Sequence, residues 1–218
     1  FRGSIFSHLG EKSNLWVIRL AGGQSWRAPS LIETDITTVG GNFGLFPNPF
    51  LRPESAVGYD FKMISPFHYG KYFTASQFVC SYQNMIDLTY GIFIPAQMDT
   101  SKPHALSEFV GARNENIYRA RINGFEITGN YTQHMGKSTW RLFADYTYIN
   151  PINLNHQNDS VLRFLKYRMQ HIAHANAQLL LHEKWNMLVS CRYTSFMKHI
   201  DTELEQYVPG IKDLREAH

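Results

Sequence analysis

The side chains that could do chemistry in this 218-residue chain are scattered acids, histidines and cysteines. Asp60 with Glu126, or Asp145 with Glu126, would supply the two carboxylates of an acid–base hydrolase. Carboxylates are equally common on the polar side of a sheet, however. The chain has no glycine-rich phosphate loop, Gly-x-Ser-x-Gly elbow, His-Glu-x-x-His helix or Cys-x-x-Cys pair. The sequence therefore supports neither an enzyme nor a bound cofactor.

The histidines and cysteines do not predict a metal site. His171 and His174 are three positions apart, and in a strand this spacing sends their rings to opposite faces, so they cannot share a metal ion. Cys80 and Cys191 each lie in an apolar stretch, which does not indicate a thiolate site and leaves a single disulfide open. A ligand role for an individual histidine also stays open.

Composition narrows the class of protein. The chain is 44% hydrophobic and 14% aromatic but only 18% charged, which excludes a coiled coil or a disordered tail. The net charge of +3 is not gathered into a Lys/Arg block, so no nucleic-acid partner is indicated. A mean hydropathy of -0.31 and the lack of an apolar run of about 18 residues argue against a transmembrane helix.

Alternation with a period of two residues is the dominant pattern. It is clearest in segments 14–27, 57–63, 140–148 and 173–193, and it predicts an all-β chain with strands of about ten residues. One face of these strands is apolar and carries Trp16, Ile18, Leu20, Tyr59, Phe61, Trp140, Leu142, Tyr146, Met187 and Val189. The opposite face is polar and carries Arg19, Asp60, Lys62, Glu126, Asp145, Asn176, Gln178 and Arg192.

The connections between these strands differ in length. Short connections at 10–13, 65–71, 135–137 and 182–184 alternate with longer ones, which lie at 28–54, 95–115 and 150–163. Short turns at one end and long loops at the other are typical of an outer-membrane barrel, whose outer face is apolar. A soluble β-sandwich would also bury one face of each strand, so periodicity alone leaves that alternative open.

Five separated stretches, in the same order, resemble the TonB-dependent outer-membrane receptors. The segment 19–29 is Arg-Leu-Ala-Gly-Gly-Gln-Ser-Trp-Arg-Ala-Pro, and 48–55 is Asn-Pro-Phe-Leu-Arg-Pro-Glu-Ser. The later matches are at 120–126, 145–151 and 165–171. The resemblance covers most of the chain. We expect these motifs to be structural, with prolines ending strand pairing.

The resemblance implies a transmembrane, antiparallel, up-and-down β-barrel. Residues 1–218 would form a partial outer-membrane barrel domain of about eight consecutive strands, late in a 22-stranded barrel. The plug domain and the first and last strands are then expected outside this chain. The apolar face would contact outer-membrane lipid of a Gram-negative bacterium, and the polar face would line a plugged lumen.

The implied function is import of a scarce, large nutrient, with a metal chelate or another large nutrient as substrate and the TonB complex acting through the plug. An iron chelate (siderophore) is the leading substrate. Cobalamin, or an oligosaccharide or peptide taken up with a surface lipoprotein, are the alternatives. A passive porin and a soluble carbohydrate-binding β-sandwich are rivals from other classes. Haem receptors of this family carry a histidine between the Ala-Pro and Asn-Pro motifs. No histidine lies between Pro29 and Asn48 here, so this kind of haem site is disfavoured.

The long connection at 28–54 is the predicted place for substrate capture, since binding residues commonly lie on loops held by a rigid scaffold. It combines charge with aromatic side chains, which suits an amphipathic ligand. The candidate substrate-binding residues there and at the strand end before it are Arg27, Glu33, Asp35, Asn42, Phe43, Phe46 and Phe50.

Overall fold

The computed structural model describes residues 2–10, 15–40, 43–66, 70–93, 110–182 and 184–200. Apart from one helical turn, α1 (Leu31–Thr34), the elements are strands. The strands are β1 (Arg2–Leu9), β2 (Trp16–Arg27), β3 (Thr38–Gly40), β4 (Phe43–Phe46), β5 (Glu54–Ile64), β6 (Tyr72–Ile92), β7 (Val110–Met135), β8 (Ser138–Asn153), β9 (His171–Leu181) and β10 (Trp185–Thr194).

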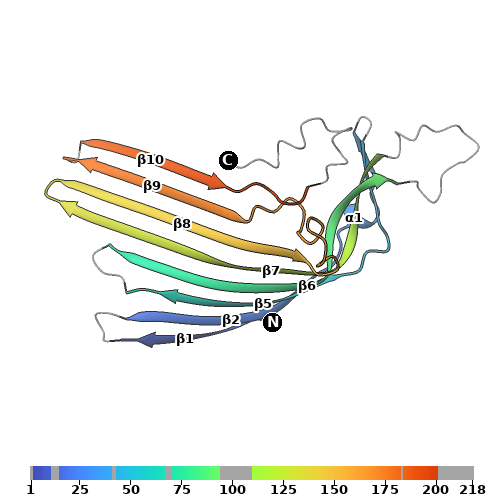
Figure 1. Cartoon of the computed structure of the whole chain (residues 1–218), viewed down its shortest axis with the longest axis horizontal. Coiled ribbons are helices and arrows are strands. Elements are labelled where there is room, and N and C mark those ends of the chain that lie inside the picture. The colour runs from blue at the N-terminus through green and yellow to red at the C-terminus, as the bar shows by residue number, and fades with distance from the viewer. Residues whose placement is uncertain are drawn as a thin grey trace, which may run out of the picture. The chain divides into compact units, whose positions relative to one another are not determined.

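Eight of these strands follow one another in a single path, β1-β2-β5-β6-β7-β8-β9-β10. Strands that are adjacent along this path can be followed in Figure 1. The pairings of β1 with β2, β8 with β9, and β9 with β10 are all antiparallel. The expected all-β fold with about eight strands is thus confirmed. No helix in the described ranges is long and apolar enough to cross a membrane.

The described chain forms two compact units, and each is considered by itself. The first comprises Phe1–Gln24, Val57–Ser81 and Arg121–His218, and the second comprises Ser25–Ala56 and Tyr82–Ala120. Within the first unit the register places Trp140 opposite Leu179 and Asp145 opposite His174. Phe143 opposite Asn176 is an exception to the alternation.

The apolar face of the first unit is exposed. Tyr59 is 64% exposed, Met187 60% and Val189 69%. A β-sandwich would bury such residues between two sheets at interior packing density. Because these side chains lack that cover within the described ranges, the described strands do not form a soluble sandwich core.

A small buried core lies where the β8–β9 connection meets the residues after β10. Pro151, Leu165 and His199 are buried there. The backbone N–H of Tyr167 donates to the carbonyl of His199 at 3.0 Å. The Ser195 hydroxyl oxygen accepts the N–H groups of residues 170 and 171 at 3.0 and 3.1 Å. The connection predicted at 150–163 is thus a folded segment that extends to 170.

The second unit departs from the sequence-based expectation. The connection at 28–54 contains α1, β3 and β4, and β4 pairs in parallel with β7, with Gly44 opposite Gly111. A Cβ added to Gly111 would overlap the Gly44 carbonyl oxygen, so this close approach requires glycine.

Strand lengths and one boundary also differ from expectation. β6 has 21 residues and β7 has 26, about twice the predicted ten. β7 starts at Val110, inside the connection predicted at 95–115. The asparagine at 116 resembles loop sequence, but hydrogen bonds described below join it to backbone groups of neighbouring segments.

Candidate functional site

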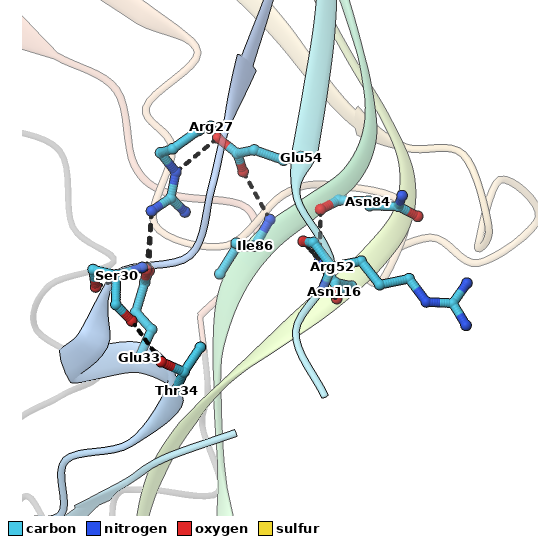
Figure 2. Close-up of polar contacts among 9 residues, drawn as sticks. All are labelled: Arg27, Ser30, Glu33, Thr34, Arg52, Glu54, Asn84, Ile86 and Asn116. Carbon is cyan, nitrogen blue, oxygen red and sulfur yellow. Dashed lines mark hydrogen bonds and ion pairs between the residues drawn. The ribbon is translucent and has the colours of Figure 1, made fainter. Parts of the chain in front are cut away.

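One polar cluster of the second unit joins the end of β2 to α1 and β5. The Arg27 guanidinium donates from Nε to Glu54 Oε1 at 3.0 Å and from Nη1 to both carboxylate oxygens of Glu33 at 3.1 Å. Figure 2 shows Arg27 between the two acids. One arginine thereby links the two ends of the 28–54 connection, with a planar donor geometry that suits carboxylates.

Glu33 also fixes the start of α1. Its Oε2 accepts the backbone N–H of Ser30 at 2.7 Å and the Ser30 hydroxyl at 2.9 Å, as in a capping box. Partial burial acts to raise the pKa of Glu33. The hydrogen bonds from Ser30, and then the hydrogen bond and positive charge of Arg27, outweigh burial, so the pKa lies below its ordinary value.

A second set of bonds anchors the connection to β6 and β7. Glu54 Oε2 accepts the backbone N–H of Ile86 at 2.9 Å. The Asn116 amide accepts the N–H of Arg52 at 2.8 Å and donates to the carbonyls of Arg52 at 3.0 Å and Asn84 at 2.8 Å (Figure 2). Asn84 has a φ of 52°, a left-handed conformation that asparagine tolerates better than most residues. These bonds satisfy backbone groups that lie outside the regular ladder.

The polar face of the first unit carries a separate series of contacts. Arg19 pairs with Asp60, and His174 Nδ1 lies 2.9 Å from Asp145 Oδ2. Gln178 accepts from Arg141 at 3.3 Å and donates to Asn186 at 2.9 Å. These contacts join neighbouring strands on one side of the sheet and form a polar lining.

Residues 13–210 match the family model described as "TonB dependent receptor-like, beta-barrel". The chain belongs to this receptor-barrel family. Its members are transport receptors of Gram-negative outer membranes. No curated protein matches the chain.

Solved structures share the receptor-barrel fold at low sequence identity. The "Copper transporter OprC" has a TM-score of 0.62 and 19% identity over 88% of this chain and 25% of its own. The siderophore receptor PirA from Pseudomonas aeruginosa gives 0.60 and 13%, over 89% and 33%. The Serratia marcescens hemophore receptor HasR, in complex with its hemophore HasA and heme, gives 0.57 and 17%, over 88% and 31%. The chain thus spans a quarter to a third of these structures.

The described candidate substrate-binding residues of this receptor barrel differ in their partners and their exposure, and their role stays a prediction. Arg27 and Glu33 are paired with each other, and the Thr34 hydroxyl donates to Asp35. Phe46 is 7% exposed, whereas Phe50 is 86% exposed. Asn42 and the side chain of Phe43 lie outside the described residues. Among the candidates whose side chains are described, Phe50 is the most exposed.

The assignment of residues to a lumen face and a lipid face of the receptor sheet stays a prediction, and the structure gives the strands, contacts and exposure of these residues. On the polar side, Arg19 meets Asp60, Asp145 meets His174, and Arg192 lies opposite His174. Asn176 and Gln178 are also on β9, while Lys62 and Glu126 lie on β5 and β7. The apolar side has exposed residues Leu20, Tyr59, Phe61, Trp140, Leu142, Met187 and Val189, and half-buried residues Trp16, Ile18 and Tyr146.

The two neighbouring histidines of the receptor have partners on opposite sides of the sheet. His171 Nδ1 lies 2.7 Å from the Tyr146 hydroxyl, whereas His174 contacts Asp145. This agrees with the parity argument against a shared metal. Among the described residues, no group of three or more His, Cys, Asp and Glu could hold a metal ion, and both cysteines are free thiols.

Sequence reasoning missed an aromatic and cationic cluster in the receptor's second unit. The Phe46 and Phe93 ring centroids are 5.8 Å apart, and the Arg113 guanidinium lies 4.6 Å from the Phe93 centroid. Arg113 also pairs with Glu115. It missed Asn116 as well. Periodicity carries no signal for such contacts, because their partners lie on elements distant in the sequence.

Proposed function

We propose that this chain is part of an outer-membrane receptor that imports a scarce, large nutrient, with an iron chelate as the leading substrate. The observation that carries this proposal is the match to the receptor-barrel family across residues 13–210. The amphipathic sheet supports it, since exposed apolar residues on one face suit lipid contact and ion pairs on the other suit a hydrated lumen.

The proposed mechanism divides the work between the two units. The sheet of the first unit spans the membrane and supplies the polar wall. The connection held by Arg27 and Asn116 in the second unit provides an extracellular surface that captures the substrate. A plug domain outside this chain would be displaced by the energised TonB complex to let the substrate pass. A surface lipoprotein partner stays part of the oligosaccharide or peptide alternative.

An iron chelate is favoured because several similar structures are siderophore or ferric enterobactin receptors. Copper is the second candidate, since one of these structures is described as a copper transporter. Haem stays less favoured because no histidine lies between Pro29 and Asn48, although one similar structure is a hemophore receptor in complex with heme. Binding an intact chelate needs loop contacts rather than a metal centre within the protein.

The decisive experiment is uptake by cells that carry the full-length gene or its deletion, with and without TonB. Cells would be supplied with radio-iron bound to a panel of siderophores, with copper, or with labelled cobalamin. We expect one iron chelate to enter in a manner that needs both the receptor and TonB. Receptor-dependent entry of copper alone would reassign the substrate. Entry that persists without TonB, with steady large conductance in planar bilayers, would indicate a passive porin.

A further inference from the structure

The apolar face of the first unit contains a hollow of about 460 Å³. Its floor includes Ala144, Ala175 and Ala177, and Leu142 and Val189 border it. The register explains the hollow, because Ala175 lies opposite Ala144 on one side and Cys191 on the other. Ala177 likewise lies between Leu142 and Val189. In these two rows, short side chains meet across three strands. The neighbouring rows carry the larger Trp, Tyr and Met side chains, so the surface is lower between them.

The size and lining of this hollow suit a hydrocarbon ligand. Its volume falls within the range of about 300–1,000 Å³ that is common for ligand pockets, and its lining is almost wholly apolar. The neighbouring residues Leu142 and Val189 are 43% and 69% exposed, so the hollow opens on the surface that contacts lipid in the proposed function. Filling it with an alkyl chain would bury apolar area on both partners.

A lysine lies beside the rim of the hollow. Tyr131 and Tyr72 line the hollow, and the Lys71 ammonium lies 4.5 Å from the centroid of the Tyr131 ring. Lys71 immediately precedes β6, at the end of the sheet that has the short connections. In an outer-membrane barrel this end faces the periplasm. An amphipathic lysine held over an interfacial tyrosine keeps its stem on the apolar surface and its charge at headgroup level.

We propose that this hollow holds one acyl chain of an anionic phospholipid from the periplasmic leaflet, with the Lys71 ammonium contacting the lipid phosphate. The inference rests on the membrane orientation given under the proposed function. The positive charge of Lys71 selects an anionic over a zwitterionic headgroup, because cations near a membrane surface attract anionic lipid. The apolar lining with three alanines suits an alkyl chain, which can follow the row of short side chains across the strands.

The test uses the full-length receptor in mild detergent with phosphatidylglycerol or phosphatidylethanolamine added in known ratio. Native mass spectrometry then counts the bound lipids. We expect the wild type to retain one phosphatidylglycerol with about five-fold preference, the effect of the ~1 kcal/mol that one lysine provides near anionic lipid. Lys71→Gln is expected to lose the preference, whereas Lys137→Gln, in the turn between β7 and β8, is expected to keep it.

A second pair of variants tests the hollow itself. Ala175→Leu fills the floor and should abolish retention of the lipid. Ala173→Leu, which adds the same bulk opposite Tyr146 and outside the hollow, should leave it unchanged. Equal retention by the two leucine variants, or no headgroup preference in the wild type, would overturn the inference.

Uptake by the same variants separates this inference from the proposed function. Normal TonB-dependent uptake together with absent lipid selectivity would refute the lipid site alone. Loss of outer-membrane location for the wild-type protein would refute the proposed function and the lipid site together.

Discussion

The sheet of the first unit and the loop assembly of the second are held together in different ways. In the sheet, polar contacts join paired neighbouring strands. Asp145 and His174 lie directly opposite each other, and Gln178 reaches Asn186 diagonally across the next strand pair. In the second unit, a few side chains bond to distant backbone, as Asn116 does to Arg52 and Asn84. The sheet therefore distributes its stability over many equivalent pairs, whereas the loop assembly depends on a small number of residues.

The largest expected effect concerns the faces of the sheet. Val189→Arg and Trp140→Arg should each destabilise the membrane-inserted barrel by about 2–4 kcal/mol, because they place a charge on the lipid face. Ser190→Arg and Arg141→Ala change neighbouring residues that are predicted to lie on the opposite, polar face, and they should destabilise the barrel much less. The measurement is a urea titration of the receptor folded into lipid vesicles. The folded fraction is read from the difference in gel mobility between unheated and heated samples. Equal tolerance of both sets would refute the assignment of the faces.

Close backbone approach within the sheet gives the next largest effect. A Cβ on Gly124 would overlap the Tyr148 carbonyl oxygen, whereas one on Gly129 of the same strand meets nothing within 4 Å. Gly124→Ala should cost about 1–3 kcal/mol through overpacking, and Gly129→Ala should be nearly neutral. The same urea titration measures both. A neutral Gly124→Ala would mean that the strands separate there at little cost.

In the loop assembly, Asn116→Ala removes three hydrogen bonds to backbone groups. We expect residues 48–54 to open more readily by about 1–3 kcal/mol, the usual effect of leaving such groups unsatisfied. Hydrogen exchange of the Arg52 amide reports the opening. Asn116→Asp, which retains the acceptor for that amide, should have a smaller effect there. Unchanged exchange in Asn116→Ala would show that strand pairing of β5 holds residues 48–54 in place without this side chain.

The smallest effect is the pH response of α1. The pKa of Glu33 in the folded protein is below its ordinary value of 4.5, so its contribution is fully present above 4.5 and is lost as pH falls through the lower folded value. Because Arg27 is 45% exposed, this contribution should stay below about 1 kcal/mol. Amide exchange at residues 31–35, corrected for intrinsic rates, should speed up at acid pH. Glu33→Gln should remove that acid response.

The sheet was predictable because its signal is local. Alternation in segments such as 140–148 places each side chain on a face from its own position in the chain. It also separated Asp145 from Tyr146, and His174 from His171, before any partner was known. The longer strands β6 and β7 were underestimated, because alternation weakens around Asn84, which has a left-handed backbone, and around Asn116, whose side chain bonds to backbone.

The candidate site was only partly predictable. Arg27 and Glu33 were singled out as charged residues near the loop, but their mutual pairing, which also includes Glu54, depends on where the chain returns. Phe46 was also singled out, but not its burial beside Phe93 and near Arg113. Sequence spacing cannot predict these contacts, because the residues lie on separate elements that come together through the pairing of β4 with β7.

The sequence by itself determined the all-β class, the two chemically different faces and the receptor-barrel family, since these depend on period, composition and motifs along the chain. Only the tertiary structure decided that Arg27 and Asn116 fasten the long connection, that Gly111 admits β4, and that three alanines meet to form a hollow beside Lys71. The physical reason is that side-chain direction is a property of one strand, whereas closeness in space depends on the register among several.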